Sequence, residues 1–144
     1  YRASQAGVQV ELVVRGFCCL RPAMPGLSAN IRIRSVVGRF LEHSRIFWFG
    51  AGKEDPLEGD FFIGSADWMG RNLDRRVEAV VPIEEATLHQ KLLNLIDAYL
   101  ADNCTAWDMQ ADGSFVRRMP DEDNVAVQAG LIDGWHRSPC DSDI

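Results

Sequence analysis

Alternating apolar and polar residues, rich in β-branched side chains, mark five short stretches that we predict to be β-strands. The five stretches are Gln9–Arg15, Ile31–Val36, Ile46–Phe49, Phe61–Gly64 and Val77–Val81. Several are almost continuously apolar, which is typical of central strands in a sheet covered on both faces. Before the first stretch, the residues up to Gly7 indicate the last turns of a helix that this glycine ends.

The clearest helical period lies in PIEEATLHQKLLNLIDAYLADN, which begins at Pro82 and has Glu84 and Glu85 in its first turn. Its apolar residues recur on one face, which we interpret as a core face rather than a docking surface. These residues are Leu88, Leu92, Leu95, Ile96 and Leu100. A shorter helical pattern precedes His43, in GRFLE.

The C-terminal part of the sequence predicts two further elements. AWDMQADGSFVRRMP indicates a hairpin that turns around residues 111–114, and DEDNVAVQAGLIDGW indicates a short helix with an acidic cap. Residues 136–144 are polar, and we expect them to form a loose tail. The mixture of strands and helices predicts an α/β fold, in which a layered sheet is flanked by helices and followed by this hairpin and helix.

A chain of 144 residues, 47% hydrophobic and 25% charged, predicts one domain over residues 1–144 with its core in residues 1–135. No apolar run approaches the roughly 18 residues that a membrane span needs. Because the sequence starts with tyrosine inside a helical pattern, we expect it to be a piece of a longer polypeptide. The spacing of its four cysteines matches neither a zinc knuckle nor a CxxC pair, which favours reduced cysteines and a cytoplasmic location. We interpret Cys18 and Cys19 as packing residues.

The net charge of −6 conceals an uneven distribution along the chain. Residues 15–76 contain nine arginines and one lysine against seven acidic residues, a net charge of +3, whereas residues 77–144 have a net charge of −9. The guanidinium group of arginine binds phosphate and carboxylate in a bidentate fashion. The arginine-rich region therefore suggests an anion-binding site.

Three segments of this region contain candidate functional residues. Arg15 ends a predicted strand, where α/β proteins often bind ligands, although it could instead satisfy loop carbonyl groups. His43 and Arg45 are two residues apart at the start of a strand and are expected on one face, where a histidine beside a guanidinium could act on a phosphate. His89 and His136 have no comparable surroundings, and we expect them at the surface.

The third segment, FFIGSADWMGRNLDRRVEAVVPI, combines small residues at a strand end with a polar cluster. The small residues would allow a ligand to approach the backbone. The candidates in this segment are Ser65, Asp67, Arg71 and Arg76. An alternative is that Asp74 and Glu78 pair with these arginines in a buried network that binds no ligand.

Two long runs, VRGFCCLRPAMPGLSANIRIRSVVGRFLEHSRIFWF and IGSADWMGRNLDRRVEAVVPI, closely resemble the C-terminal catalytic domain of bacterial polyphosphate kinases. AWDMQADGSFVRRMP resembles the closing hairpin of that family, so the resemblance covers nearly the whole chain. The resemblance implies a phospholipase-D-like fold. It also implies an enzyme that reversibly transfers the terminal phosphate of ATP to polyphosphate, with Mg²⁺, through a phosphohistidine.

In the family, the phosphorylated histidine and the arginines associated with Mg²⁺ lie in the preceding catalytic domain, so we expect no metal ligands in this chain. By resemblance, Arg15 is the nucleotide-binding arginine, His43 the second essential histidine and Arg76 a phosphate-contacting arginine. Arg45 in the first run and Ser65, Asp67 and Arg71 in the second run are supporting candidates. The chain alone is expected to be inactive.

The implied partners are ATP or ADP, inorganic polyphosphate and the remaining domains of the polypeptide, which is expected to form a homo-oligomer. We expect no membrane span and no specific nucleic acid, and peripheral membrane association of the full enzyme stays open.

The sequence departs from the HxK motif of phospholipase D, because His43-Ser44-Arg45 lacks the lysine and the following strand lacks an aspartate. Gly70 and Ala29 also differ from the family pattern, without removing a charge. The departure from HxK counts against a phosphodiesterase nucleophile. Two alternatives nevertheless stay open: a phosphodiesterase half-site with His43 as nucleophile, and a non-catalytic module that binds polyanions.

Overall fold

The computed structural model of the chain describes residues 1–16, 18–120 and 123–134, and it separates two compact units. Unit 1 consists of Tyr1–Glu42 and Ala98–Ile144, and unit 2 consists of His43–Asp97. The expected α/β class is confirmed, but the strands form two sheets rather than one. The single domain over residues 1–144 stays a prediction, and the expected tail at residues 136–144 lies outside the described residues.

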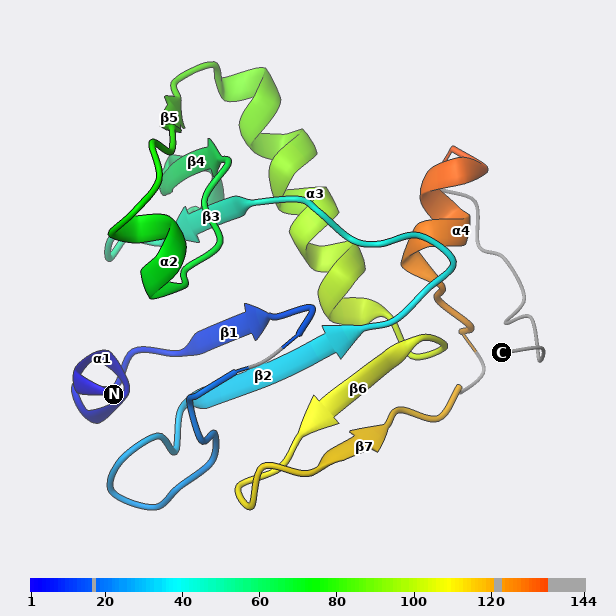
Figure 1. Cartoon of the computed structure of the whole chain (residues 1–144). Coiled ribbons are helices and arrows are strands. Elements are labelled where there is room, and N and C mark those ends of the chain that lie inside the picture. Colours follow the sequence, from blue (N-terminus) through cyan, green and yellow to red (C-terminus); the bar gives the residue numbers. More distant parts are fainter. Residues whose placement is uncertain (17, 121–122, 135–144) are drawn as a thin grey trace. The chain divides into compact units, whose positions relative to one another are not determined.

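Unit 1 contains a four-stranded sheet in the order β1-β2-β6-β7 (Figure 1). The strands are β1 (Val10–Val13), β2 (Ile31–Val36), β6 (Ala106–Met109) and β7 (Phe115–Arg117). β1 and β2 are parallel, whereas the other two pairs are antiparallel. β2 has a neighbour on each side, and its Ile31 and Ile33 are each 2% exposed. The predicted hairpin is confirmed, since the turn at residues 111–114 joins β6 to β7.

Two short helices of unit 1 also lie where the sequence indicates them. α1 (Arg2–Gln5) is followed by Gly7, whose positive φ of 90° suits glycine. α4 (Val127–Ile132) is the predicted short helix, but the expected acidic cap within its own segment is wrong. Its N-cap residue is Ala126, which supplies no side-chain acceptor.

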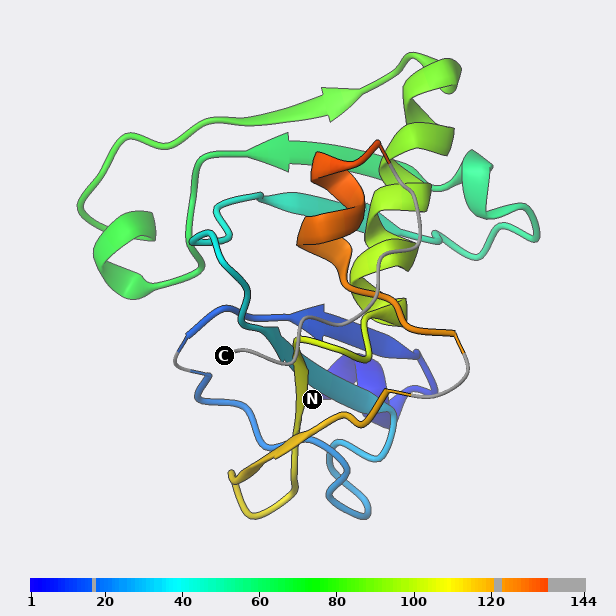
Figure 2. The same ribbon diagram turned by 90° about the vertical axis from the view of Figure 1, so that its right-hand side faces the viewer.

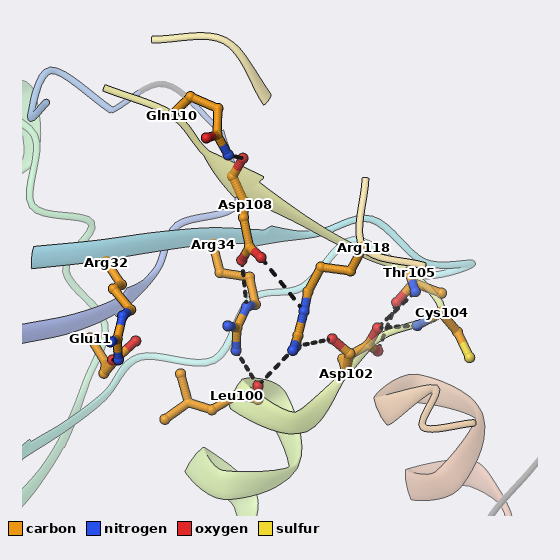
Figure 3. Close-up of polar contacts among 10 residues, drawn as sticks. All are labelled: Glu11, Arg32, Arg34, Leu100, Asp102, Cys104, Thr105, Asp108, Gln110 and Arg118. Atoms are coloured by element: carbon orange, nitrogen blue, oxygen red, sulfur yellow. Dashed lines mark hydrogen bonds and ion pairs between the residues drawn. The ribbon is translucent and has the colours of Figure 1, made fainter. Parts of the chain in front are cut away.

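The acceptor for α4 comes instead from the turn that follows α3 (Ala86–Ala101), where Asp102 is 0% exposed. Its Oδ1 accepts hydrogen bonds from the backbone N–H groups of Cys104 at 3.1 Å and Thr105 at 2.7 Å (Figure 3). Its Oδ2 accepts from the Thr105 hydroxyl and from the N–H of Val127, each at 2.8 Å. One buried carboxylate therefore orders the turn and caps α4.

Two arginines bind the C-terminal end of α3 in unit 1 (Figure 3). Arg34 and Arg118 both donate to the carbonyl oxygen of Leu100, and both pair with the Asp108 carboxylate, at 3.0 Å and 3.6 Å. The last carbonyl groups of a helix lack partners within it and carry partial negative charge, so cations stabilise this end. Arg34 therefore belongs to the framework of the unit, although it lies in the arginine-rich region.

Unit 2 contains a three-stranded antiparallel sheet in the order β3-β4-β5 (Figure 2). Its elements are β3 (Ile46–Phe49), the 3-10 helix η1 (Pro56–Glu58), β4 (Asp60–Gly64), α2 (Gly70–Leu73), β5 (Val80–Ile83) and the part of α3 up to Asp97. β4 lies in the centre, and its Phe61 is 1% exposed. The predicted β3 and β4 are confirmed.

The fifth predicted strand is displaced, because β5 begins three residues later than expected and includes Pro82 opposite Phe62. Proline is tolerated here because β5 is an edge strand. The expectation of a sheet covered on both faces is also wrong for this unit. Phe49 on β3 and Val80 on β5 are 50% and 51% exposed.

Three smaller expectations differ from the structure. The segment at residues 38–42 is not helical. Cys18 and Cys19 are free, but Cys19 is exposed and does not pack as expected. Cys104 is disulfide-bonded, which contradicts fully reduced cysteines, and Cys140 lies outside the described residues. Among the residues described, no helix is both long and apolar enough to cross a membrane.

Candidate functional site

His43 opens unit 2 and is an exposed residue in a segment without regular secondary structure immediately before β3. Its carbonyl oxygen accepts a hydrogen bond from Nη1 of Arg45, which also donates to the Ser44 carbonyl at 3.4 Å. The structure therefore brings Arg45 to the backbone of His43, by turning the guanidinium back along the chain.

Arg45 also reaches the loop that follows β4, where its Nη2 lies 2.5 Å from Oδ1 of Asp67. The side chains of Arg45 and Asp67 are 11% and 30% exposed. Short, charge-assisted bonds of this kind are among the stronger polar contacts in proteins, and here solvent reaches little of the arginine. Arg45 is consequently occupied by protein groups, and so it supports His43 rather than presenting a free guanidinium to an anion.

Ser65 ties the same loop to the segment before β5. Its hydroxyl donates to Oε2 of Glu78 at 2.5 Å and accepts from the N–H of Ala79 at 3.1 Å. The small residue before it serves packing as well, since a Cβ at Gly64 would lie 3.0 Å from the Ala79 carbonyl oxygen. The hydrogen bonds of Ser65 therefore connect two candidate segments, so this residue has a structural role.

An aromatic contact adds to these connections. The indole ring of Trp68 stacks on Phe47 of β3, with 5.2 Å between ring centroids and 18° between planes. Because Arg45 and Phe47 are alternate residues, the loop after β4 contacts the chain at two successive positions of the same face. Together, these contacts join the LEHSR and GSADW segments within unit 2.

Arg71, Arg75 and Arg76 follow this loop, in α2 and directly after it. All three are exposed, and none of them forms an ion pair with any described residue. The expectation that Asp74 and Glu78 hold these arginines is therefore wrong, because Glu78 binds Ser65 instead. Three guanidinium groups are left open to solvent next to the segments that Arg45 and Ser65 connect.

Arg15 belongs to unit 1, where it follows β1. Its Nη1 donates to the carbonyl oxygen of Glu42 at 2.5 Å, and Tyr99 donates its hydroxyl proton to the Glu42 carboxylate. Glu42 immediately precedes His43 in the sequence. One of the five N–H donors of the Arg15 guanidinium thus binds a loop carbonyl group, as one of the two interpretations of this residue expected. The loop that it binds is the one that leads to His43.

Residues 38–42, the lead-in segment to His43, are also bound by α4. Phe40 donates its backbone N–H to Oε1 of Gln128 at 3.0 Å, and Nε2 of Gln128 donates to the Phe40 carbonyl at 2.8 Å. Side-chain bonds of this kind satisfy the backbone in place of a helix, and this explains the absence of the helical turn expected here. The lead-in is fixed at two points of unit 1 before the chain enters unit 2.

His89 was expected at the surface, but it is half-buried in unit 2 and binds two backbone carbonyl groups. Its Nδ1 lies 2.8 Å from the Leu57 oxygen and its Nε2 lies 2.7 Å from the Ile83 oxygen, while its ring stacks 4.4 Å from Phe61. Both ring nitrogens donate only in the imidazolium form. These two carbonyl groups, chiefly that of Ile83, therefore raise the pKa of His89, with a smaller contribution from Glu85.

The described residues contain no cluster of three or more histidine, cysteine, aspartate or glutamate side chains that could hold a metal ion. In the candidate segments, the Asp67 carboxylate is bound to Arg45 and that of Glu78 to Ser65. The donor set of residues 1–16, 18–120 and 123–134 therefore does not fit a Mg²⁺ site.

Comparisons with known proteins agree with one another. The family described as "Polyphosphate kinase C-terminal domain 2" matches residues 1–129. A polyphosphate kinase of Parasynechococcus marenigrum is 53% identical over 137 residues, which is 94% of this chain and 19% of that protein. A polyphosphate kinase of Pseudomonas aeruginosa is 54% identical over 120 residues, which is 83% of this chain and 17% of that protein.

The fold is similar to a solved structure as well. The crystal structure of polyphosphate kinase from Porphyromonas gingivalis matches with a TM-score of 0.82 and 39% identity, over 92% of this chain and 20% of that one. The chain thus spans about a fifth of the length of the relatives it matches.

Proposed function

The chain belongs to the polyphosphate kinase family as its C-terminal domain, and from this premise we propose how it contributes to phosphoryl transfer in a full-length polypeptide. The proposed reaction is the reversible transfer of the terminal phosphate of ATP to inorganic polyphosphate. The phospholipase-D-like α/β fold expected from the resemblance is consistent with the structural match. The nucleophilic histidine is proposed to lie in a preceding domain, so that this chain alone is inactive.

The observation that carries the proposal is the set of exposed arginines, Arg71, Arg75 and Arg76, that follow the loop contacted by Arg45 and form no ion pair with a described residue. Phosphoryl transfer requires in-line positioning and neutralisation of charge on the transferring oxygens, and little covalent chemistry from the protein. Arg76, supported by Arg71, can contact phosphate because no described carboxylate neutralises either side chain. Arg15 keeps donors for a nucleotide phosphate beyond the one that binds Glu42.

We assign His43 the role of a hydrogen-bond donor or general acid toward the phosphate that leaves or accepts the transferring group. An imidazole ring nitrogen that carries a proton can donate it, or a hydrogen bond, to a phosphate oxygen at this step. Its exposed position in front of β3 leaves it accessible to groups from the rest of the polypeptide.

Mg²⁺ would supply charge neutralisation on the phosphates, but the donor set of the described residues does not fit it. The roles proposed for His43, Arg15 and Arg76 therefore involve no metal ion bound to this chain. We propose that the ligands of Mg²⁺ lie in the preceding domain. We also propose that the whole enzyme forms a homo-oligomer and is located in the cytoplasm.

One observation disfavours the phosphodiesterase alternative, in which His43 is the nucleophile of an HxK-like motif. Arg45 occupies the lysine position, and its guanidinium is held by Asp67 and by backbone carbonyl groups instead of facing a phosphate. This alternative predicts a covalent phosphoenzyme at His43, which labelled substrate would reveal.

The test uses the full-length enzyme that contains this chain and measures polyphosphate synthesis from ATP. We expect His43→Ala to lower kcat by on the order of 10² or more, with little change in the KM of ATP. Arg76→Ala should weaken polyphosphate binding and reduce the slope of log affinity against log salt by about one. The control is Arg32→Ala, which removes an arginine paired with Glu11 in unit 1 and should change neither quantity.

Each alternative has its own outcome in this experiment. Wild-type kcat in His43→Ala, with weaker binding in Arg76→Ala, would support a polyanion-binding module in place of a catalytic domain. Polyphosphate synthesis by the 144-residue chain alone would contradict a nucleophile in another domain.

A further inference from the structure

The ion pair between Arg45 and Asp67 differs from an isolated surface salt bridge, because the same guanidinium group also binds the backbone of His43. Nη2 of Arg45 binds Asp67, while Nη1 binds the carbonyl oxygen of His43. The remaining guanidinium nitrogen, Nε, is buried without a hydrogen-bond partner. A buried cation that leaves one donor unsatisfied needs its other partners to compensate, so the geometry at both ends is restricted.

The two ends of this pair lie in segments that adjoin different strands of unit 2, because Arg45 immediately precedes β3 and Asp67 lies in the loop after β4. The carbonyl oxygen of Arg45 accepts from the N–H of Gly64 at 3.0 Å, which aligns the entrance of β3 with the end of β4. The stack of Trp68 on Phe47 then holds the loop beyond Gly64 against β3. The backbone of His43 is consequently tied to the loop through a planar group that has few degrees of freedom of its own.

We propose that Arg45 and Asp67 are positioning residues for His43: the carboxylate orients the guanidinium, and the guanidinium fixes the backbone from which the imidazole projects. This inference rests on the proposed function of His43 in phosphoryl transfer. Misplacement of a reacting group by about 1 Å can cost on the order of 10² in rate. The pair therefore contributes to the rate while touching no substrate.

The experiment compares Asp67→Asn with Asp108→Asn in the full-length enzyme. Asp108 is a matched control, because its pair with Arg34 has similar exposed fractions, 12% and 42%, but lies in unit 1. Asn keeps the shape of Asp and removes its charge. We expect Asp67→Asn to lower kcat by about tenfold or more with the KM of ATP within about twofold, whereas Asp108→Asn keeps the wild-type kcat.

A second variant and a double variant separate positioning from general stability. Arg45→Lys retains the charge but cannot bind Asp67 and the His43 carbonyl as a planar fork, so it should lower kcat as Asp67→Asn does. In a His43→Gln background, Asp67→Asn should lower the residual rate no further, because the group that it positions has been replaced. The melting temperature of every variant is measured alongside.

The outcomes distinguish this inference from the function on which it rests. Wild-type kcat in both Asp67→Asn and Arg45→Lys would overturn the positioning role, even if His43→Ala is inactive. Additive losses in the His43→Gln background, an equal loss in Asp108→Asn, or failure of both variants to fold would also overturn it, since each shows a merely structural role. Wild-type kcat in His43→Ala would instead refute the proposed function itself.

Discussion

Replacing Asp102 by asparagine tests a buried polar group that connects several segments of unit 1. The Asp102 carboxylate is fully buried and accepts four hydrogen bonds, two at each oxygen. An asparagine amide has one accepting oxygen and one donating nitrogen. With its oxygen in the Oδ1 position it keeps the N–H groups of Cys104 and Thr105, and the Thr105 hydroxyl can rotate to accept from the new NH₂. The N–H of Val127 then faces a donor and loses its bond.

The expected loss of stability follows from this count. A buried donor left without a partner costs about 1–3 kcal/mol. The three surviving bonds lose their charge assistance, about 1 kcal/mol each, and the smaller cost of burying a neutral amide offsets part of this. We therefore expect Asp102→Asn to lower the free energy of unfolding by about 2–4 kcal/mol, a large share of the total of about 5–15 kcal/mol for a domain.

Urea titration of the chain, followed by circular dichroism, measures this quantity. With a slope of about 2 kcal/mol per molar urea, the midpoint should fall by about 1–2 M. Glu11→Gln, which breaks the exposed pair with Arg32, is the control and should change stability by less than about 1 kcal/mol. An unchanged midpoint in Asp102→Asn would refute the reasoning, because it would show that the cap of α4 and the turn do not depend on the carboxylate.

Two further changes test other parts of the framework. A Cβ at Gly38 would lie 2.2 Å from Oε1 of Gln128, so Gly38→Ala should displace this side chain from Phe40 and lower the melting temperature, while Gly16→Ala, with no atom within 4 Å, should not. His89 stabilises unit 2 fully below its unfolded pKa of 6.5 and loses this contribution as the pH rises through its raised folded pKa. The melting-temperature difference between wild type and His89→Gln should therefore shrink from about pH 5.5 to about pH 8.5, and a constant difference would contradict this.

Local sequence patterns predicted the elements whose determinants are local. The β-branched and apolar run of β2 and the heptad-like apolar face of α3 specify a strand and a helix whatever surrounds them. The displaced strand β5 shows where this fails. The run VEAVVPI fits several registers, and pairing of Ile63 with Val81 selects one that leaves Val77 fully exposed.

The candidate site shows the same difference between features with local determinants, which could be predicted, and features that depend on distant residues, which could not. His43 and Asp67 could be singled out from residue type and neighbours, but their connection through Arg45 spans two strands and has no sequence signal. His89 was missed because its partners are the backbone carbonyl groups of Leu57 and Ile83, which every residue possesses. The resemblance to a known family supplied residue roles that spacing alone left open.

The discontinuous composition of unit 1 has a consequence for how the chain folds during synthesis. β2 has more buried residues than any other strand of its sheet. Its antiparallel partner is β6, which pairs Ala106 with Val36, 70 residues earlier in the chain. At about 5–20 residues per second, roughly 4–14 s separate the synthesis of the two strands. All of the unit 2 strands are completed within that interval. Synthesis of unit 2 is therefore finished before unit 1 is complete. One edge of β2 stays unpaired until the chain beyond the turn that Asp102 organises has been made.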